Sequence, residues 1–153
     1  MLIYLINFIS IPLYNLIIKN KIFFVGLVSL QLFLILALRA NDLGPDLVGY
    51  QETYRYIGFF SWQNLFSRLH LISTAELASL MGIESGYTVF NWLIYQLGFS
   101  YHGFLVICAL CSIVPVGVFF YRYSLNPCLS FLIYISTNLY FYNFGILRQS
   151  LAI

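Results

Sequence analysis

The feature that most constrains the fold is an apolar run without a single charge, FLVICALCSIVPVGVFF at residues 104–120. Similar runs occur elsewhere, so that 61% of the residues are hydrophobic and only 8% are charged. A soluble domain carries about 25% charged residues, and this chain therefore lacks the charges needed to cover a surface in water. We predict an all-α membrane protein, because helices satisfy their backbone hydrogen bonds internally within a bilayer.

Four apolar runs are candidates for transmembrane helices. A helix needs about 20 residues to cross a bilayer, within a range of roughly 17–25. The second run is marginal by this measure, and the fourth needs help from the aromatic residues that flank it. We predict a polytopic fold with about four spans, at residues 1–18, 22–38, 103–121 and 129–144.

Basic residues in the two short connections predict the orientation of these spans. Lys19 and Lys21 lie between the first and second runs, and Arg122 lies between the third and fourth. Short loops that carry lysine and arginine stay in the cytoplasm. This rule places the amino terminus, residues 39–102 and Arg148 together on the outer side of the membrane.

The long outer segment, residues 39–102, has the pattern of short amphipathic helices. Its first part begins at Gly44 and Pro45, which suit a helix start. Helical spacing then aligns one face that consists of Asp46, Tyr50, Tyr54 and Ile57. Residues 73–82, STAELASLMG, carry a capping box and end on glycine. Residues 84–98 end at Gly98 and align a second face of Tyr87, Phe90, Asn91 and Ile94. We expect these helices to lie on the outer leaflet or to roof a cavity.

Two arginines have more than one interpretation. Arg39 ends the second span, and it is either a snorkelling anchor paired with a nearby aspartate or, together with Asp46, a grip for a charged lipid head group. Arg148 lies four residues after Phe144, where an arginine near membrane depth tends to face a wet or paired site. An anchor and a phosphate-binding role are both open for Arg148.

Other polar residues favour structural roles. Amides within the spans are more often partners in hydrogen bonds between helices than ligands, and they are Asn7, Asn15, Gln31, Asn138 and Asn143. Cys108 and Cys111 lie in an apolar run and fit packing better than redox chemistry. We find no spacing typical of a metal site or a cofactor-binding loop, and no basic stripe that would bind nucleic acid.

Three fragments of the sequence, taken in order, resemble a known family. They are LRANDLGPDLVGYQETY at residues 38–54, ESGYTVFNWLIYQLG at residues 84–98, and YSLNPCLSFLIYISTNLYFYNFGILRQSLA at residues 123–152. The shared pattern is R-x(4)-G-x-D-x(3)-Y after the second span, then E-x-G-Y-x(3)-N, and finally R-Q-x-x-A. In this order the fragments resemble the EpsG family of bacterial exopolysaccharide membrane proteins, which are related to Wzy-type O-antigen and capsule polymerases.

The resemblance implies a glycosyltransferase-type polymerase in a bacterial cytoplasmic (inner) membrane. Its substrate would be a glycan linked to undecaprenyl pyrophosphate, and other polysaccharide-assembly membrane proteins would be candidate partners. The motif positions implied as catalytic are Arg39, Asp46 and Arg148. Those implied as substrate-binding are Tyr50, Glu84, Tyr87, Asn91 and Gln149. Pro45 departs from the family, which more often has a small polar residue there.

Family members continue through further spans after the arginine–glutamine motif. The resemblance therefore implies that residues 1–153 are a single membrane domain from the amino-terminal part of a longer polytopic protein. Two alternatives to a polymerase stay open. One is an inactive truncated fragment, and the other is a transporter or flippase of lipid-linked glycans, which would carry polar residues through the middles of its spans.

Overall fold

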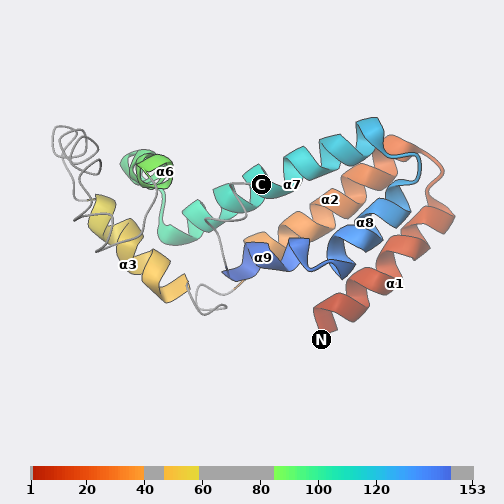
Figure 1. Ribbon diagram of the computed structural model, residues 1–153, viewed down its shortest axis with the longest axis horizontal. Helices are drawn as coiled ribbons and strands as arrows, with labels where there is room; N and C mark the ends of the chain where they lie inside the picture. The colour runs from red at the N-terminus through yellow and green to blue at the C-terminus, as the bar shows by residue number, and fades with distance from the viewer. Residues whose placement is uncertain (1, 40–46, 59–84, 146–153) are drawn as a thin grey trace.

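The computed structural model describes residues 2–39, 47–58 and 85–145, and all regular elements in these segments are helices. Among the described residues, four helices lie alongside one another as a bundle, and a short helix extends the last of them (Figure 1). The helices of the bundle are α1 (Leu2–Ile17), α2 (Lys21–Ala37), α7 (Tyr101–Tyr123), α8 (Pro127–Ser136) and α9 (Leu139–Gly145). Two further helices, α3 (Leu47–Gly58) and α6 (Ser85–Gln96), lie beside the first turns of α7. We call α3 and α6 together the cap.

The bundle packs most extensively between α2 and α7, with α1 and α8 on one side of them. Its apolar interior, the bundle core, consists of Ile11, Phe24, Val25, Val28, Leu32, Leu36, Ala109, Ile113, Cys128, Phe131, Tyr134, Ile135 and Tyr140. Gly117 allows α7 to approach Ser29 of α2 closely, because a Cβ atom there would lie 2.6 Å from the Ser29 hydroxyl oxygen. Small residues at such contacts are typical of helices that pack within a membrane.

Local signals in the sequence explain where these helices begin. Asn20, Ser100 and Asn126 each accept a backbone N–H at the start of the following helix, which satisfies one of the donors that a helix start leaves open. Pro127 occupies the first turn of α8, where a missing N–H costs nothing. Both short connections lie at the same end of the bundle, since Lys21 Nζ donates to the Ser124 carbonyl at 2.7 Å. This contact is consistent with both loops lying on one side of a membrane, and which side that is stays a prediction.

Among the described residues, α7 is the one helix long and apolar enough to cross a bilayer. The helices α2 and α8 and the part of α1 from Leu5 to Ile17 are apolar but shorter. The expected spans at residues 1–18, 22–38 and 103–121 correspond to single helices, whereas the count of four crossings stays a prediction.

The fourth apolar run is not one helix, and this expectation was wrong. The helix α8 ends at Ser136, and α9 begins at Leu139. Asn138 between them has a φ of 61°, a left-handed conformation that asparagine tolerates better than most residues. Its N–H donates to the Ile135 carbonyl at 3.1 Å, as is common just beyond a helix end.

The cap confirms two of the expected amphipathic faces. Tyr50, Tyr54 and Ile57 of α3 are buried, and so are Tyr87, Asn91 and Ile94 of α6. The turn after α6 is a Schellman motif at Gly98, which has a φ of 82°. There the Gly98 N–H donates to the Tyr95 carbonyl and the Phe99 N–H donates to the Ile94 carbonyl. The expected helix at residues 73–82 and the helix start at Gly44 and Pro45 lie outside the described residues.

An amide network joins α1 to α2, as the sequence predicts for polar residues within apolar helices. Gln31 Nε2 donates to Asn7 Oδ1 at 2.7 Å and to Ser10 Oγ at 2.8 Å. Asn15, by contrast, is exposed. Interhelical hydrogen bonds of this kind stabilise membrane helices by about 0.6 kcal/mol on average, so Gln31 contributes to the packing of the bundle.

Candidate functional site

The candidate site is built around Arg39, which follows α2 at the end of the bundle that carries the cap. Its side chain is 6% exposed. Removing a guanidinium from water costs several kcal/mol unless other groups replace its hydration. A simple snorkelling anchor would extend its charged group into water, and the burial of Arg39 disfavours that interpretation.

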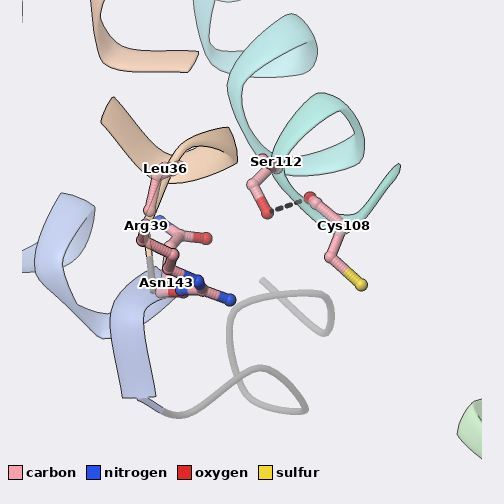
Figure 2. Close-up of a pocket in the computed structure, with 6 residues that line it drawn as sticks. Leu36, Arg39, Cys108, Ser112 and Asn143 are labelled. Carbon is pink, nitrogen blue, oxygen red and sulfur yellow. Dashed lines mark hydrogen bonds between the residues drawn. The ribbon is translucent and has the colours of Figure 1, made fainter. Parts of the chain in front are cut away.

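The Arg39 guanidinium lies between the end of α9 and the middle of α7. Its Nη1 donates to the main-chain carbonyl of Asn143. Arg39 and Asn143 lie on one side of a narrow pocket and Cys108 and Ser112 of α7 lie on the other (Figure 2). Leu36 and Ala109 complete the lining. The hydroxyl of Ser112 donates to the Cys108 carbonyl at 2.9 Å, within α7 itself.

About 160 Å³ of empty space lies between the residues that line this pocket, part of it open to the surroundings, and none of it is wide enough to hold a water molecule. Sites for whole small molecules are typically about 300–1,000 Å³, so the pocket is too small for a sugar repeat. It contains the arginine side chain itself, and an oligosaccharide would have to lie outside it. A ligand would therefore reach the guanidinium only after the lining side chains move apart.

The electrostatic surroundings of Arg39 come from both parts of the molecule. Burial lowers the pKa of Arg39 from its usual value, and nearby Tyr101, Cys108 and Tyr140 act in the opposite direction. An arginine remains protonated in proteins even so. Arg39 thus provides a permanent positive charge within an otherwise apolar region.

Two of the residues predicted to bind substrate, Tyr50 and Tyr87, belong to a second apolar cluster, the outer cluster, and a third, Asn91, contacts it through Tyr87. The outer cluster consists of Tyr50, Tyr54, Tyr87, Ile94, Tyr101, Phe104, Leu105 and Cys108. The rings of Tyr50 and Tyr87 lie with their centroids 5.9 Å apart. Asn91 is fully buried, and its Nδ2 donates to the Tyr87 carbonyl at 2.8 Å. Burial raises the pKa of Tyr87, and the adjacent Asn91 side chain opposes that shift.

Arg39 and the outer cluster are linked through α7. Tyr101 interacts electrostatically with both Arg39 and Tyr50, and Cys108 belongs to the cluster while lining the pocket of Arg39. Tyr50, Tyr87 and Asn91 themselves are buried. In this conformation they form the core of the cap and do not present an open surface to a sugar.

The other predicted site residues lie outside the described residues. They are Asp46, Glu84, Arg148 and Gln149. Gly86 belongs to the same E-x-G-Y-x(3)-N pattern as Glu84; it is among the described residues and is exposed on α6. The proximity of Arg148 and the two acids to Arg39 thus stays a prediction.

Sequence reasoning did not identify Asn143 as part of the site. It treated this residue as one of several amides within spans, and nothing in the sequence distinguishes it from Asn138 or Asn15. The signal that could have found it is its place near the end of the fourth apolar run, because that end was expected on the same side of the membrane as Arg39. Within the described segments, no group of histidine, cysteine, aspartate or glutamate side chains is arranged to hold a metal ion.

Comparison with known proteins places these observations in one family. The model of the EpsG family matches residues 21–153. No curated protein matches the chain significantly, and neither does any solved structure. The match covers most of the sequence, including α2 with Arg39, both cap helices and the whole of α7, α8 and α9. The chain therefore belongs to the EpsG family of exopolysaccharide-related membrane proteins.

Proposed function

We propose that this protein polymerises lipid-linked oligosaccharide repeats in exopolysaccharide, capsule or O-antigen biosynthesis. Membership of the EpsG family supports a membrane location, a polymerase-type role and a lipid-linked glycan substrate. In the proposed reaction a hydroxyl of the terminal sugar of one repeat attacks the anomeric carbon of a growing glycan. The bond from that carbon to undecaprenyl pyrophosphate breaks, and the hydroxyl proton passes to a base.

The observation that carries the proposal is the buried guanidinium of Arg39 between α7 and α9. A departing pyrophosphate develops negative charge on the bridging oxygen as the glycosidic bond breaks. A fixed cation in an apolar region stabilises such charge far more strongly than it would in water. Arginine also holds phosphate oxygens through two parallel N–H donors.

The remaining site residues receive roles that follow from their chemistry and the family pattern. Arg148 would share the pyrophosphate with Arg39. Asp46 or Glu84 would orient an arginine or accept the proton of the acceptor hydroxyl. The glycan would lie against the cap at the outer face of a bacterial cytoplasmic membrane that the chain crosses several times. It would contact Gln149, and it would contact Tyr50, Tyr87 and Asn91 once the cap opens to expose them.

The distribution of charge supports a polymerase over a transporter or flippase of the same lipid. Lys21 lies at the first residue of α2 and Arg122 lies in the last turn of α7. Arg39 follows the opposite end of α2. A transporter typically binds its substrate near the middle of the bilayer. Two polar residues inside the described bundle, Gln31 and Asn7, instead bond to each other.

The proposal is tested with membranes that contain the chain and are supplied with a lipid-linked repeat. Arg39→Ala should slow the formation of long glycans by about 10²–10³-fold, the usual effect of removing one donor that stabilises developing charge. Arg39→Lys should retain part of the activity because it keeps the charge but loses the planar fork. The matched control is Arg55→Ala, since Arg55 is exposed on α3. Glycans of normal length and amount from Arg39→Ala membranes would contradict the proposal.

A further inference from the structure

Asn143 makes contacts in two directions at the end of α9. Its main-chain carbonyl accepts the hydrogen bond from Arg39 Nη1. Its side-chain Nδ2 lies 3.0 Å from the Tyr140 carbonyl, 3.3 Å from the Leu139 carbonyl and 3.4 Å from the Tyr134 hydroxyl, to all of which it donates. We propose that Asn143 is a positioning residue whose amide sets the orientation of Arg39, an inference that rests on the proposed function of Arg39 as the group that binds pyrophosphate.

The orientation of the Asn143 amide follows from its neighbours. The nitrogen faces two main-chain carbonyls, which can only accept hydrogen bonds, so the opposite orientation would bring oxygen against oxygen. The side chain is 5% exposed, and Oδ1 has no hydrogen-bond partner among the described residues. The residue lines the pocket of Arg39. The Oδ1 atom of Asn143 is therefore a buried hydrogen-bond acceptor in the pocket that Arg39 also lines.

The amide bridges the break between α8 and α9. Tyr134 belongs to α8 and Asn143 to α9, and the left-handed residue Asn138 lies between them. A continuous helix would not need such a bridge, because its own backbone hydrogen bonds would hold both halves in line. At this break the contact from Asn143 Nδ2 to the Tyr134 hydroxyl restrains the direction in which α9 leaves α8.

A second contact fixes α9 against α2. The Tyr140 hydroxyl donates to the Leu32 carbonyl at 2.9 Å, and the side chain is fully buried. Leu32 lies in α2 seven residues before Arg39, which follows the end of that helix. The end of α9 is thus held by α8 on one side and by α2 on the other, and its carbonyl meets Arg39 at a defined point. Loss of the amide would release one of these two restraints and move the carbonyl that orients the guanidinium.

The test is a double-mutant cycle between Asn143 and Arg39, read as the rate of glycan polymerisation in membranes containing the chain. Asn143→Ala keeps the main-chain carbonyl and removes only the amide. It should lower the rate by about tenfold when residue 39 is arginine, within the range usual for coupled neighbours. In the Arg39→Lys background it should lower the rate less than about twofold, because a flexible ammonium is not oriented by one carbonyl. The control is Asn15→Ala, at an exposed asparagine of α1.

The outcomes separate this inference from the function on which it rests. An equal fall in both backgrounds, or no fall in either, would overturn the positioning role of Asn143. Unchanged polymerisation by Arg39→Ala would instead overturn the proposed function. If Asn143→Ala lowers the helical content or melting temperature of the purified protein, Tyr134→Phe decides, since it removes only the hydroxyl that receives the amide. Tyr134→Phe should lower the polymerisation rate less than Asn143→Ala does, and again mainly when residue 39 is arginine. An equal fall in rate in the Arg39→Lys background would refute the inference.

Discussion

The bundle and the cap are both closely packed, but we predict that the bundle faces lipid and that the cap faces water. Phe131 in the bundle core and Phe104 in the outer cluster are each fully buried. Phe131 packs edge-on against Phe120 with the ring centroids 4.9 Å apart. Phe104 is surrounded by the rings of Tyr54, Tyr87 and Tyr101, with centroids 5.0, 6.2 and 6.1 Å away.

This comparison teaches that equal burial does not mean equal stabilisation. If the bundle lies in lipid, opening it exchanges contacts with protein for contacts with hydrocarbon, and only packing and polar contacts are lost. Opening the cap exposes aromatic surface to water, at about 25 cal/mol per Å² of apolar area. Arg39 lies where the two regions meet, since its neighbours Tyr101 and Tyr140 come from the outer cluster and the bundle core respectively.

The largest expected effect is a difference between two matched phenylalanine substitutions. Phe104 lies at the start of α7, and Phe104→Ala should destabilise the packing of the cap against that helix by about 3–5 kcal/mol, the usual cost of this change where the opened site meets water. Phe131→Ala should cost clearly less, because lipid can solvate the opened bundle. Hydrogen exchange of the amides of α3, α6, α2 and α8, followed by mass spectrometry in lipid nanodiscs, measures both. Equal losses in the two regions would mean that the cap, too, is embedded in lipid.

A smaller effect is expected at the contact between the two cap helices. A Cβ atom on Gly58 would overlap the ring of Tyr95, whereas one on Gly49 of the same helix would meet no atom within 4 Å. Gly58→Ala should therefore destabilise the cap by about 1–3 kcal/mol through overpacking. Gly49→Ala should stabilise it by about 0.4–1 kcal/mol, because alanine has less freedom to lose than glycine. The hydrogen-exchange rates of the α3 and α6 amides should rise in Gly58→Ala and fall in Gly49→Ala. Similar changes in both variants would contradict this packing.

The smallest effect concerns the phenol of Tyr54, whose hydroxyl donates to the Phe99 carbonyl at 2.8 Å. Tyr54→Phe should cost about 0.5–1.5 kcal/mol in cap stability near neutral pH. Burial also raises the pKa of Tyr54 from 10.0 to about 12. The unfolded cap therefore loses this proton at a lower pH than the folded cap does. The protonated Tyr54 phenol therefore contributes fully to the stability of the cap below pH 10, and this contribution declines as the pH rises from 10 to about 12.

The exchange rates of the α3 amides between pH 9 and pH 12, corrected for the intrinsic pH dependence of exchange, test this titration. Tyr54→Phe should reduce the loss of cap stability at high pH without abolishing it. Part of the loss remains because burial also raises the pKa of Tyr87. An unchanged decline in the variant would show that Tyr54 does not couple cap stability to pH.

Much of the fold could be predicted because its signals are local. Apolar length identified the helices of the bundle, and helical spacing identified the buried faces that carry Tyr50 and Tyr87. Gly98 ended α6 as expected, because only a residue that tolerates positive φ fits that turn. The resemblance to the EpsG family was confirmed by the match over residues 21–153.

The break in the fourth run and the setting of Arg39 could not be predicted in the same way. Asn138 follows Ser136 and Thr137, but the run from Leu129 to Phe144 is mostly apolar and reads as continuous. Its left-handed turn accompanies the packing of α9 against α2. The contact between Arg39 and Asn143 joins residues 104 positions apart, and no local pattern encodes such a contact. Sequence could select Arg39 as a candidate, but only the tertiary structure shows that it is buried between the bundle core and the outer cluster.

The central claim is that the buried guanidinium of Arg39 binds the pyrophosphate of a lipid-linked glycan. The most direct measurement is isothermal titration calorimetry of inorganic pyrophosphate into the detergent-solubilised protein and into its Arg39→Ala and Arg55→Ala variants. We predict saturable binding that weakens by about tenfold or more in Arg39→Ala, as expected when a charge-assisted hydrogen bond is lost, and that stays unchanged in Arg55→Ala. Equal affinity of the Arg39→Ala variant and the unaltered protein would contradict the claim.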